Sequence, residues 1–199
     1  MSNTDNVVDN NNVEQHEQQQ AEQDQATLST RLLIRNNLVG KLIGHEGSNI
    51  KRLRAESNAV ISILKSHVKN PKERIVFIQA RTNNELITAV KLIAQMLINN
   101  DEGAANDETV NNSDTVALWL LVHQYYVGAI LGEKGASIKE IQENYSVYVQ
   151  ISTFSMYKST EKVVTITGTP ENIAQAYNRI YQIMEENQKK PYTKTILFV

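Results

Sequence analysis

The sequence predicts an α+β fold made of two copies of one unit, each with the element order β-α-α-β-β-α. Three observations support this prediction. A glycine-containing segment recurs 88 positions along the chain, the same order of apolar patterns surrounds both copies, and a polar stretch separates them. A chain of 199 residues with 41% hydrophobic content is long enough for two small domains.

The repeated segment reads VGKLIGHEGSNIKRL at Val39–Leu53 and VGAILGEKGASIKEI at Val127–Ile141. Six of the eight glycines in the chain fall at matched positions of these copies. A single G-x-x-G occurs by chance in many turns, whereas a duplicate in register with its flanks indicates repeated units. The matched residues are Val39 and Val127, Gly40 and Gly128, Gly44 and Gly132, Gly47 and Gly135, Ile50 and Ile138, and Lys51 and Lys139.

Each unit begins with a strand and a short helix. Apolar runs at 29–35 and 115–122 predict the first strand of each unit. The short helical patterns that follow end at the first glycine of each G-x-x-G segment, Gly44 and Gly132. After the glycines, Ser48–Ser57 and its counterpart Ala136–Tyr145 place apolar residues at i, i+3 spacing, as one face of a second helix requires.

The second half of each unit reads as two strands and a long helix. Alternating apolar residues predict strands at 59–64 and 147–152, and again at 74–80 and 162–168. Amphipathic patterns then predict a last helix in each unit, the second of which opens with Pro170 in its first turn.

Composition predicts the domain boundaries. Residues 1–27 are rich in Asn, Gln and Glu and carry few large apolar side chains, so we expect a disordered tail. The first unit then spans 28–100, a flexible acidic linker 101–113, and the second unit 114–188. Residues 189–199 end in an apolar strand pattern, which indicates either an added edge strand or the start of a third unit.

Several classes of function find no support in the sequence. There is no cysteine, so thiol catalysis and thiolate metal sites are excluded. The four histidines, at positions 16, 45, 67 and 123, have no metal-ligand spacing and belong to no nucleophile-base constellation. His45 and Glu46 could suggest catalysis, but the second copy reads G-E-K-G and keeps neither role. We therefore expect no enzyme, no metal and no cofactor.

No apolar run is long enough to span a bilayer, and the first residues lack the pattern of a secretory signal. We therefore expect a soluble protein of the nucleus, the cytoplasm or both, without a membrane partner.

The formal net charge of −2 conceals a polarised distribution. Residues 28–100 carry twelve Lys and Arg against four Asp and Glu, which gives +8, whereas residues 114–188 carry five against eight, which gives −3. Attraction of a charged partner depends on the local potential, so the first unit is the better candidate for binding a polyanion.

The duplicated G-x-x-G between two helices, together with the β-α-α-β-β-α order, resembles the eukaryotic type I KH (hnRNP K homology) domain. Within that family the chain is most similar to multi-KH, poly(C)-binding proteins, and its Asn/Gln-rich tail is typical of fungal relatives. The resemblance implies that each unit is a three-stranded antiparallel sheet packed against three helices. It also implies binding of single-stranded RNA without catalysis, in an adaptor for mRNA processing, localisation, stability or translation.

The G-x-x-G glycines have a physical reason to lie at an RNA interface. Gly44 and Gly132 end a helix where a left-handed residue is needed, and glycine adopts that conformation without steric cost. Gly47 and Gly135 begin the next helix, whose free amides attract anions. KH loops of this kind clamp about four nucleotides. The expected contact residues here are Gly40, Gly44, His45, Glu46, Gly47 and Ser48, and in the second unit Gly128, Gly132, Glu133, Lys134, Gly135 and Ala136.

The resemblance also assigns an apolar groove that holds the bases. For each of these residues, packing in the core is the alternative to base contact. The groove residues are Val39, Ile43, Ile50, Leu53, Ile61 and Ile63 in the first unit, and Val127, Leu131, Ile138, Ile141, Val149 and Ile151 in the second.

Basic residues surround the first groove more densely than the second, which predicts that the first unit is the main RNA-binding unit. A solubilising charged surface is the alternative explanation. The acidic Glu46 and Glu133 depart from the family pattern, in which both central loop positions are often basic. The residues are Lys41, Lys51, Arg52, Arg54, Lys65, Lys69, Lys72 and Arg74, against Lys134, Lys139, Lys158 and Lys162.

The base preference cannot be carried over from poly(C)-binding relatives. At the positions that we match to their two cytosine-reading arginines, this chain has Val60 and Arg74, then Tyr148 and Lys162. Only Arg74 fits, so cytosine specificity is not predicted.

Most aromatic residues lie in the second unit, and some could stack on bases. Trp119, Tyr177 and Tyr181 occupy positions that favour a core or an interface instead. Since family members often pair through the first strand and last helix, we expect docking of the two units on each other or a homodimer. The alternative function is a protein-interaction scaffold in which one or both units, the second above all, do not bind RNA. Other RNA-processing proteins are expected partners, and single-stranded DNA stays an alternative ligand.

Overall fold

The computed structural model describes residues 28–66, 71–98, 114–156 and 159–188. The predicted tail at 1–27, the linker at 101–113 and the extension at 189–199 lie outside them. The described residues confirm the α+β fold and the repeated element order. Unit one comprises β1 (Leu28–Arg35), α2 (Asn36–Ile43), α3 (Ser48–Ser57), β2 (Val60–Ile63), β3 (Glu73–Ala80) and α4 (Asn83–Leu97). Unit two comprises β4 (Val116–His123), α5 (Gln124–Leu131), α6 (Ala136–Tyr145), β5 (Tyr148–Ile151), β6 (Glu161–Gly168) and α7 (Pro170–Glu186).

The two long helices each begin at a threonine cap, and Pro170 lies in the first turn of the second, as predicted. Thr82 accepts a hydrogen bond from the Glu85 amide, and the Glu85 carboxylate accepts one from the Thr82 amide, which forms a capping box at the start of α4. Thr169 caps α7 in the same way by accepting from the Asn172 amide, with Pro170 in the first turn. These caps position both helices against the sheet.

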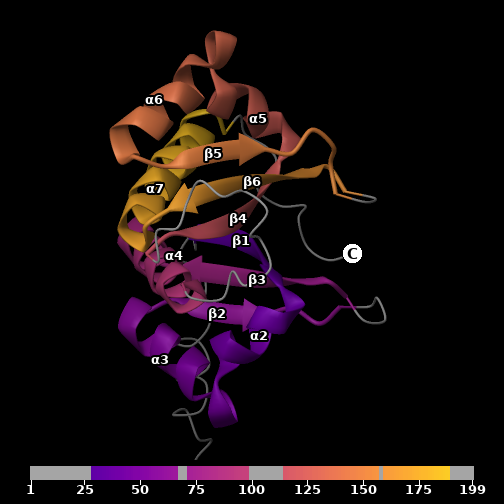
Figure 1. The fold of residues 1–199 in the computed structure, drawn as a ribbon, viewed down its shortest axis with the longest axis vertical. Coiled ribbons are helices and arrows are strands. Elements are labelled where there is room, and N and C mark those ends of the chain that lie inside the picture. The colour runs from indigo at the N-terminus through magenta and orange to yellow at the C-terminus, as the bar shows by residue number, and fades with distance from the viewer. Residues whose placement is uncertain (1–27, 67–70, 99–113, 157–158, 189–199) are drawn as a thin grey trace, which may run out of the picture.

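The strands form one antiparallel sheet with the order β2-β3-β1-β4-β6-β5. Each unit contributes three strands, as expected, but the sheet continues from one unit into the next. Among the described residues, the strands β2 and β5 are therefore its two edges. Figure 1 shows α2 and α3 at one end of the long axis and α5 and α6 at the other.

The two units are joined where β1 pairs with β4. Leu32 lies opposite Leu120, its own counterpart 88 positions later, and Leu33 lies opposite Trp119. A residue that pairs with its own counterpart indicates an approximate two-fold relation between the units. The last helices, α4 and α7, pack against each other beside this pairing. The predicted docking through first strands and last helices is thus confirmed within the chain, while a homodimer stays a prediction.

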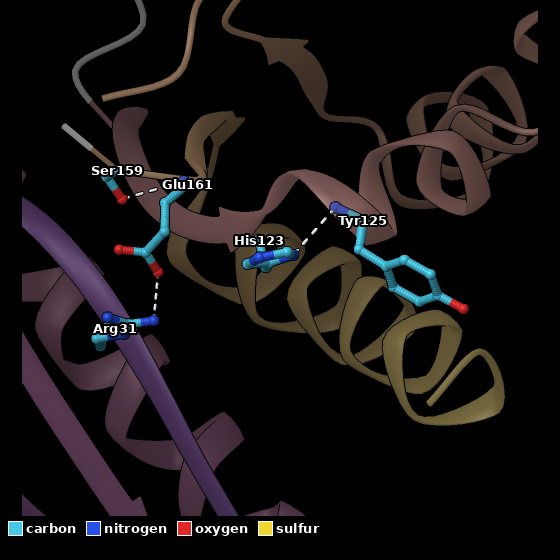
Figure 2. A network of polar contacts seen from close by, with 5 residues as sticks. All are labelled: Arg31, His123, Tyr125, Ser159 and Glu161. Atoms are coloured by element: carbon cyan, nitrogen blue, oxygen red, sulfur yellow. Dashed lines mark hydrogen bonds and ion pairs between the residues drawn. The ribbon is translucent and has the colours of Figure 1, made fainter. Parts of the chain in front are cut away.

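Polar side chains also connect the two units across the junction. Arg31 of β1 forms an ion pair with Glu161 of β6, and Figure 2 shows the two side chains facing each other. Lys91 of α4 pairs with Glu171 of α7, and the hydrogen bond from this lysine lowers the pKa of the Glu171 carboxyl. The Asn83 amide donates to the Asn178 side chain at 2.6 Å. These contacts connect β1 with β6 and α4 with α7 across the junction.

The core runs through both units without a break. It contains the inward-facing residues of all six strands and the inner faces of α4 and α7. Tyr177 is fully buried, and its hydroxyl lies beside Thr30 of the other unit. Tyr181, one helical turn later, is also buried and lies beside the backbone of Ser29. Both tyrosines are interface residues, as their spacing predicts, and Trp119 lies at the same junction.

The two interface tyrosines should make the free energy of unfolding fall at alkaline pH. Burial raises the pKa of Tyr177 above its usual range and that of Tyr181 to about 12. The unfolded chain ionises near pH 10 while the folded chain keeps both protons, so folding stability is complete below about pH 10 and falls as pH rises toward about 12. We expect the free energy of unfolding in urea to fall across this range.

The variant Tyr181→Phe should lose less stability between about pH 10 and pH 12 than the parent, because it has no hydroxyl to ionise there. Tyr148→Phe is the control, since Tyr148 is 61% exposed. An equal loss in the parent and Tyr181→Phe would contradict the assignment.

Candidate nucleic-acid interface

Each G-x-x-G segment is a short turn between two helices. The amide of Gly44 donates to the carbonyl of Gly40 at 2.9 Å and closes α2. A 3-10 turn over His45–Gly47 leads into α3. The second segment repeats this geometry: the amide of Gly132 donates to the Gly128 carbonyl at 3.0 Å, and Glu133–Gly135 lead into α6. The duplicated sequence therefore gives a duplicated backbone.

The first glycine of each segment is needed because α3 begins very close to it. Gly44 has φ 74° and ψ 175°, a region that residues with a side chain avoid. A Cβ atom on Gly44 would lie 2.7 Å from Cγ and 2.8 Å from the amide nitrogen of Asn49. The positive φ of Gly44 and of Gly132 agrees with the left-handed residue expected at the end of each helix, although ψ lies outside the left-handed helical region. The left-handed helical conformation belongs to the N-cap glycine Gly47 (φ 76°, ψ 19°), where no such clash occurs.

No side chain caps the helix after each segment, although the amides of Ser48 and Ala136 donate to the carbonyls of His45 and Glu133. Gly47 caps α3, and Gly135 caps α6, without a side-chain hydrogen bond in either case. The first-turn amides of these helices therefore lack the side-chain acceptor that normally covers a helix start. Such amides, at the positive end of a helix dipole, attract phosphate and other anions.

The two central residues of each segment are exposed. Glu46 and its counterpart Lys134 share the same positive φ of 51°. The side chains of His45 and Glu133 are exposed as well. The local charge at the two loops therefore differs, although their backbones match.

The predicted groove residues divide into exposed and buried groups. Ile43 and Leu131 are 39% and 37% exposed. Their half-buried neighbours are Val127, Ile50, Ile138, Ile63 and Ile151. By contrast, the predicted base contacts Val39, Leu53, Ile61, Ile141 and Val149 are buried at 6% or less. Their side chains fill the core beneath the surface and offer no area to a base, so the expectation of direct contact is corrected for these five.

The glycines Gly40 and Gly128 are exposed on the outer face of α2 and α5, and a Cβ atom at either position would meet no neighbour within 4 Å. Each lies one helical turn before the exposed Ile43 or Leu131. Gly40 with Ile43, and Gly128 with Leu131, form an exposed, partly apolar strip along the helix that precedes each G-x-x-G segment. We call this strip together with the segment and the adjacent edge strand the loop surface of each unit.

In each loop surface, a side chain of the preceding helix forms hydrogen bonds with the backbone of the edge strand. In unit one, the Nε and Nη2 atoms of Arg54 donate to the carbonyl of Ile61 at 2.9 and 2.6 Å. In unit two, the counterpart of Arg54 is Gln142, whose Oε1 accepts from the Val149 amide at 3.0 Å. At the residue bound in this way, the other backbone group that faces outward is the Ile61 amide in unit one and the Val149 carbonyl in unit two. The role of Gln142 was not predicted, because it follows from a contact across the fold.

The basic residues of unit one are partly used within the protein. Arg74 donates from Nε and Nη2 to the Leu64 carbonyl at 2.9 and 2.6 Å, and its counterpart Lys162 donates to the Thr153 carbonyl at 2.8 Å. Lys41 donates to the Ile98 carbonyl at 3.1 Å, away from the loop. Lys51 is exposed beside the first segment, as the sequence predicts.

In unit two, Lys139 lies 3.7 Å from Glu143, which offsets part of its charge. Arg52 and Glu56 form a similar pair in unit one at 3.6 Å. Ser48 and Ala136 are exposed at the first helical positions after the glycines. Lys69 and Lys158 lie outside the described residues.

A separate cleft of about 500 Å³ lies between α3 and the end of α4 in unit one. Among the expected contact residues, those lining it are Lys41, Leu53 and Arg52, so the cleft does not coincide with the loop surface. The counterparts of Lys41 and Arg52 in unit two are Ala129 and Glu140. Within the described part of the chain, no group of three His, Asp or Glu side chains could hold a metal ion, and no helix is long and apolar enough to cross a membrane.

Comparison with known proteins identifies the same two repeated units. The sequence model described as "KH domain" matches residues 29–95 and again 119–182. A similar solved structure is the 14th KH type I domain from human Vigilin, with 22% identity, a TM-score of 0.35, and coverage of 46% of this chain and 96% of that chain. Another is a chain of the a/eIF2alpha-aDim2p-rRNA complex from Pyrococcus horikoshii OT3, with 14% identity, a TM-score of 0.31, and coverage of 84% of this chain and 97% of that chain.

Proposed function

This chain belongs to the KH domain family, a nucleic-acid-binding and non-enzymatic kind of domain, and from that premise we propose that it binds single-stranded RNA through the loop surfaces of both units. In this proposal the protein acts as an adaptor in post-transcriptional regulation or processing of mRNA, in the nucleus, the cytoplasm or both. Other RNA-processing proteins are its proposed partners.

The observation that carries the proposal is that α3 and α6 begin without a side-chain cap, next to an exposed apolar strip. The uncapped first-turn amides are placed to receive the sugar-phosphate backbone at Gly44–Gly47 and Gly132–Gly135. Bases then lie against the strip that contains Ile43 or Leu131. Their Watson–Crick edges face the outward backbone groups of β2 or β5, beside Arg54 or Gln142.

Unit one is proposed as the tighter binding site. Its charge of +8 contrasts with −3 in unit two, and phosphate contacts supply much of the affinity for nucleic acid. Arg54 also places a guanidinium beside the edge strand, where unit two has an uncharged amide.

Acidic substitutions in the loops test this function in the full chain, because the two units share one sheet. We expect His45→Asp with Glu46→Asp to weaken binding of single-stranded homopolymer RNA by at least about tenfold, or about 1.4 kcal/mol. Aspartate tolerates the positive φ at position 46. The measurement is fluorescence anisotropy with oligonucleotides of each base over a range of salt concentrations.

The matching unit-two variant, Glu133→Asp with Lys134→Asp, changes the charge by twice as much but should weaken binding less. Asn84→Asp is the control for unit one, since it adds one negative charge at the exposed start of α4, far from the loop. A larger effect from the unit-two variant would contradict the ranking of the units. Equal binding by the parent and both loop variants would contradict the proposed function. Single-stranded DNA of the same sequence tests the alternative ligand.

The competing proposal is a protein-interaction scaffold, and the exposed aromatic residues of unit two favour it. Tyr125, Tyr148 and Phe154 are 48%, 61% and 84% exposed, and aromatic side chains are enriched in protein interfaces. If this proposal is right, RNA retention should be unaffected by the loop changes in unit two.

A further inference from the structure

The arrangement of the two units places their loop surfaces at opposite ends of the molecule. The β1·β4 pairing puts unit one and unit two back to back, so the edge strands β2 and β5 are outermost. Figure 1 shows α2 with α3, and α5 with α6, at the two ends of the long axis. An RNA chain that reaches both loop surfaces must therefore pass around the joined sheet.

The distance between the two loop surfaces follows from the sheet. Five strand spacings of about 4.8 Å separate β2 from β5, which amounts to about 24 Å across the sheet. The space between is filled by the junction core, which includes Leu32, Leu120 and Tyr177. A short RNA cannot cross it directly.

The direction of the edge strands adds a second constraint. All the pairings between β2 and β5 are antiparallel, and a sheet also twists by about 20 to 25° at each pairing. Five antiparallel pairings lie between β2 and β5, so these two edge strands run in opposite directions at opposite edges of the sheet. Because the two units have the same backbone at the G-x-x-G segment, RNA follows each edge strand in the same sense. An RNA that occupies both edges must therefore turn between them.

The junction fixes this geometry. The Arg31–Glu161 and Lys91–Glu171 ion pairs and the Asn83–Asn178 hydrogen bond hold the units together. The separation of the loop surfaces is thus set by the sheet rather than by the segment that links the units.

We propose that the chain binds one RNA at two separated tracts and holds the nucleotides between them in a loop. This inference rests on the proposed function. Its ligand is a single-stranded RNA with two short binding tracts joined by a spacer that the protein does not read. An RNA whose two tracts adjoin, without a spacer, can occupy only one of the two loop surfaces at a time.

The test uses RNAs with two homopolymer tracts of the tightest-binding base, each of about four nucleotides. Abasic spacers of graded length, from none to about 20 nucleotides, join the tracts. We expect the affinity of the full chain to equal that of a single tract for short spacers. Above a threshold length it should rise by at least about tenfold and then decline slowly as the spacer lengthens.

The variant Glu133→Asp with Lys134→Asp should remove the rise, so that this variant binds long-spacer RNAs no more tightly than it binds a single tract. Stoichiometry gives a second readout: one long-spacer RNA per protein at saturation, against two single-tract RNAs. A rise without any spacer, a series that is flat at every length, or one RNA bridging two proteins would overturn the looping proposal. Failure of single tracts to bind at all would instead overturn the proposed function beneath it.

Discussion

Replacing Tyr177 by alanine should lower the free energy of unfolding of the whole chain by about 3 to 5 kcal/mol. The ring is fully buried where α7 meets the first strand of the other unit. Its removal leaves a cavity at the junction, which costs transfer free energy and lost packing together. Because the sheet runs through both units, we expect a single shifted transition in urea, followed by circular dichroism.

Tyr177→Phe is the matched control. It keeps the ring, and the hydroxyl that it removes makes no hydrogen bond of normal geometry within the described structure. The expected cost is below about 1 kcal/mol. A loss of less than about 1 kcal/mol in Tyr177→Ala would show that the two units do not depend on this contact.

Alanine at Gly44 and at Gly40 should change stability in opposite directions. At Gly44 the backbone conformation alone costs a residue with a side chain about 1 to 3 kcal/mol. The new Cβ would also collide with Asn49, which cannot move freely because its Nδ2 donates to the Lys41 carbonyl at 2.8 Å. We therefore expect strong destabilisation.

Gly40, by comparison, lies inside α2 with open space around it. Alanine there should stabilise the helix by up to about 1 kcal/mol. Urea unfolding of the two variants measures the contrast. Gly132→Ala with Gly128→Ala repeats it in unit two, where a Cβ on Gly132 would lie 2.6 Å from the Cβ of Ser137. Effects of the same sign at positions 40 and 44 would rule out the clash as the cause.

Which apolar residues of the short helices are buried could not be predicted from the sequence. Val39 and Ile43 lie on one short helix and both fit an apolar stripe, yet Val39 is 6% exposed and Ile43 39%. Which of them faces the core depends on the angle at which α2 packs on α4 and the sheet. A periodic pattern gives the face of a helix but not the packing angle.

The hydrogen bonds from side chains to the edge strands could not be predicted from the sequence either. Arg54 and Gln142 occupy matched positions, but one binds a carbonyl and the other an amide of the edge strand. Arg54 was expected to face RNA, and the structure shows that its guanidinium also forms hydrogen bonds with β2. The use of Arg74 on the Leu64 carbonyl is a further contact that no local pattern indicates.

The repeated unit, its element order and the glycines of the two loops could all be predicted from the sequence, because local backbone conformation and hydrophobic periodicity are written in neighbouring residues. The joining of the two sheets, the position of Tyr177 across the junction and the placement of the loop surfaces at opposite ends became known from the folded chain. These features depend on contacts between residues about 90 or more positions apart, such as Leu32 and Leu120. Pairing at that distance depends on the shape and packing of whole elements, which no local pattern encodes.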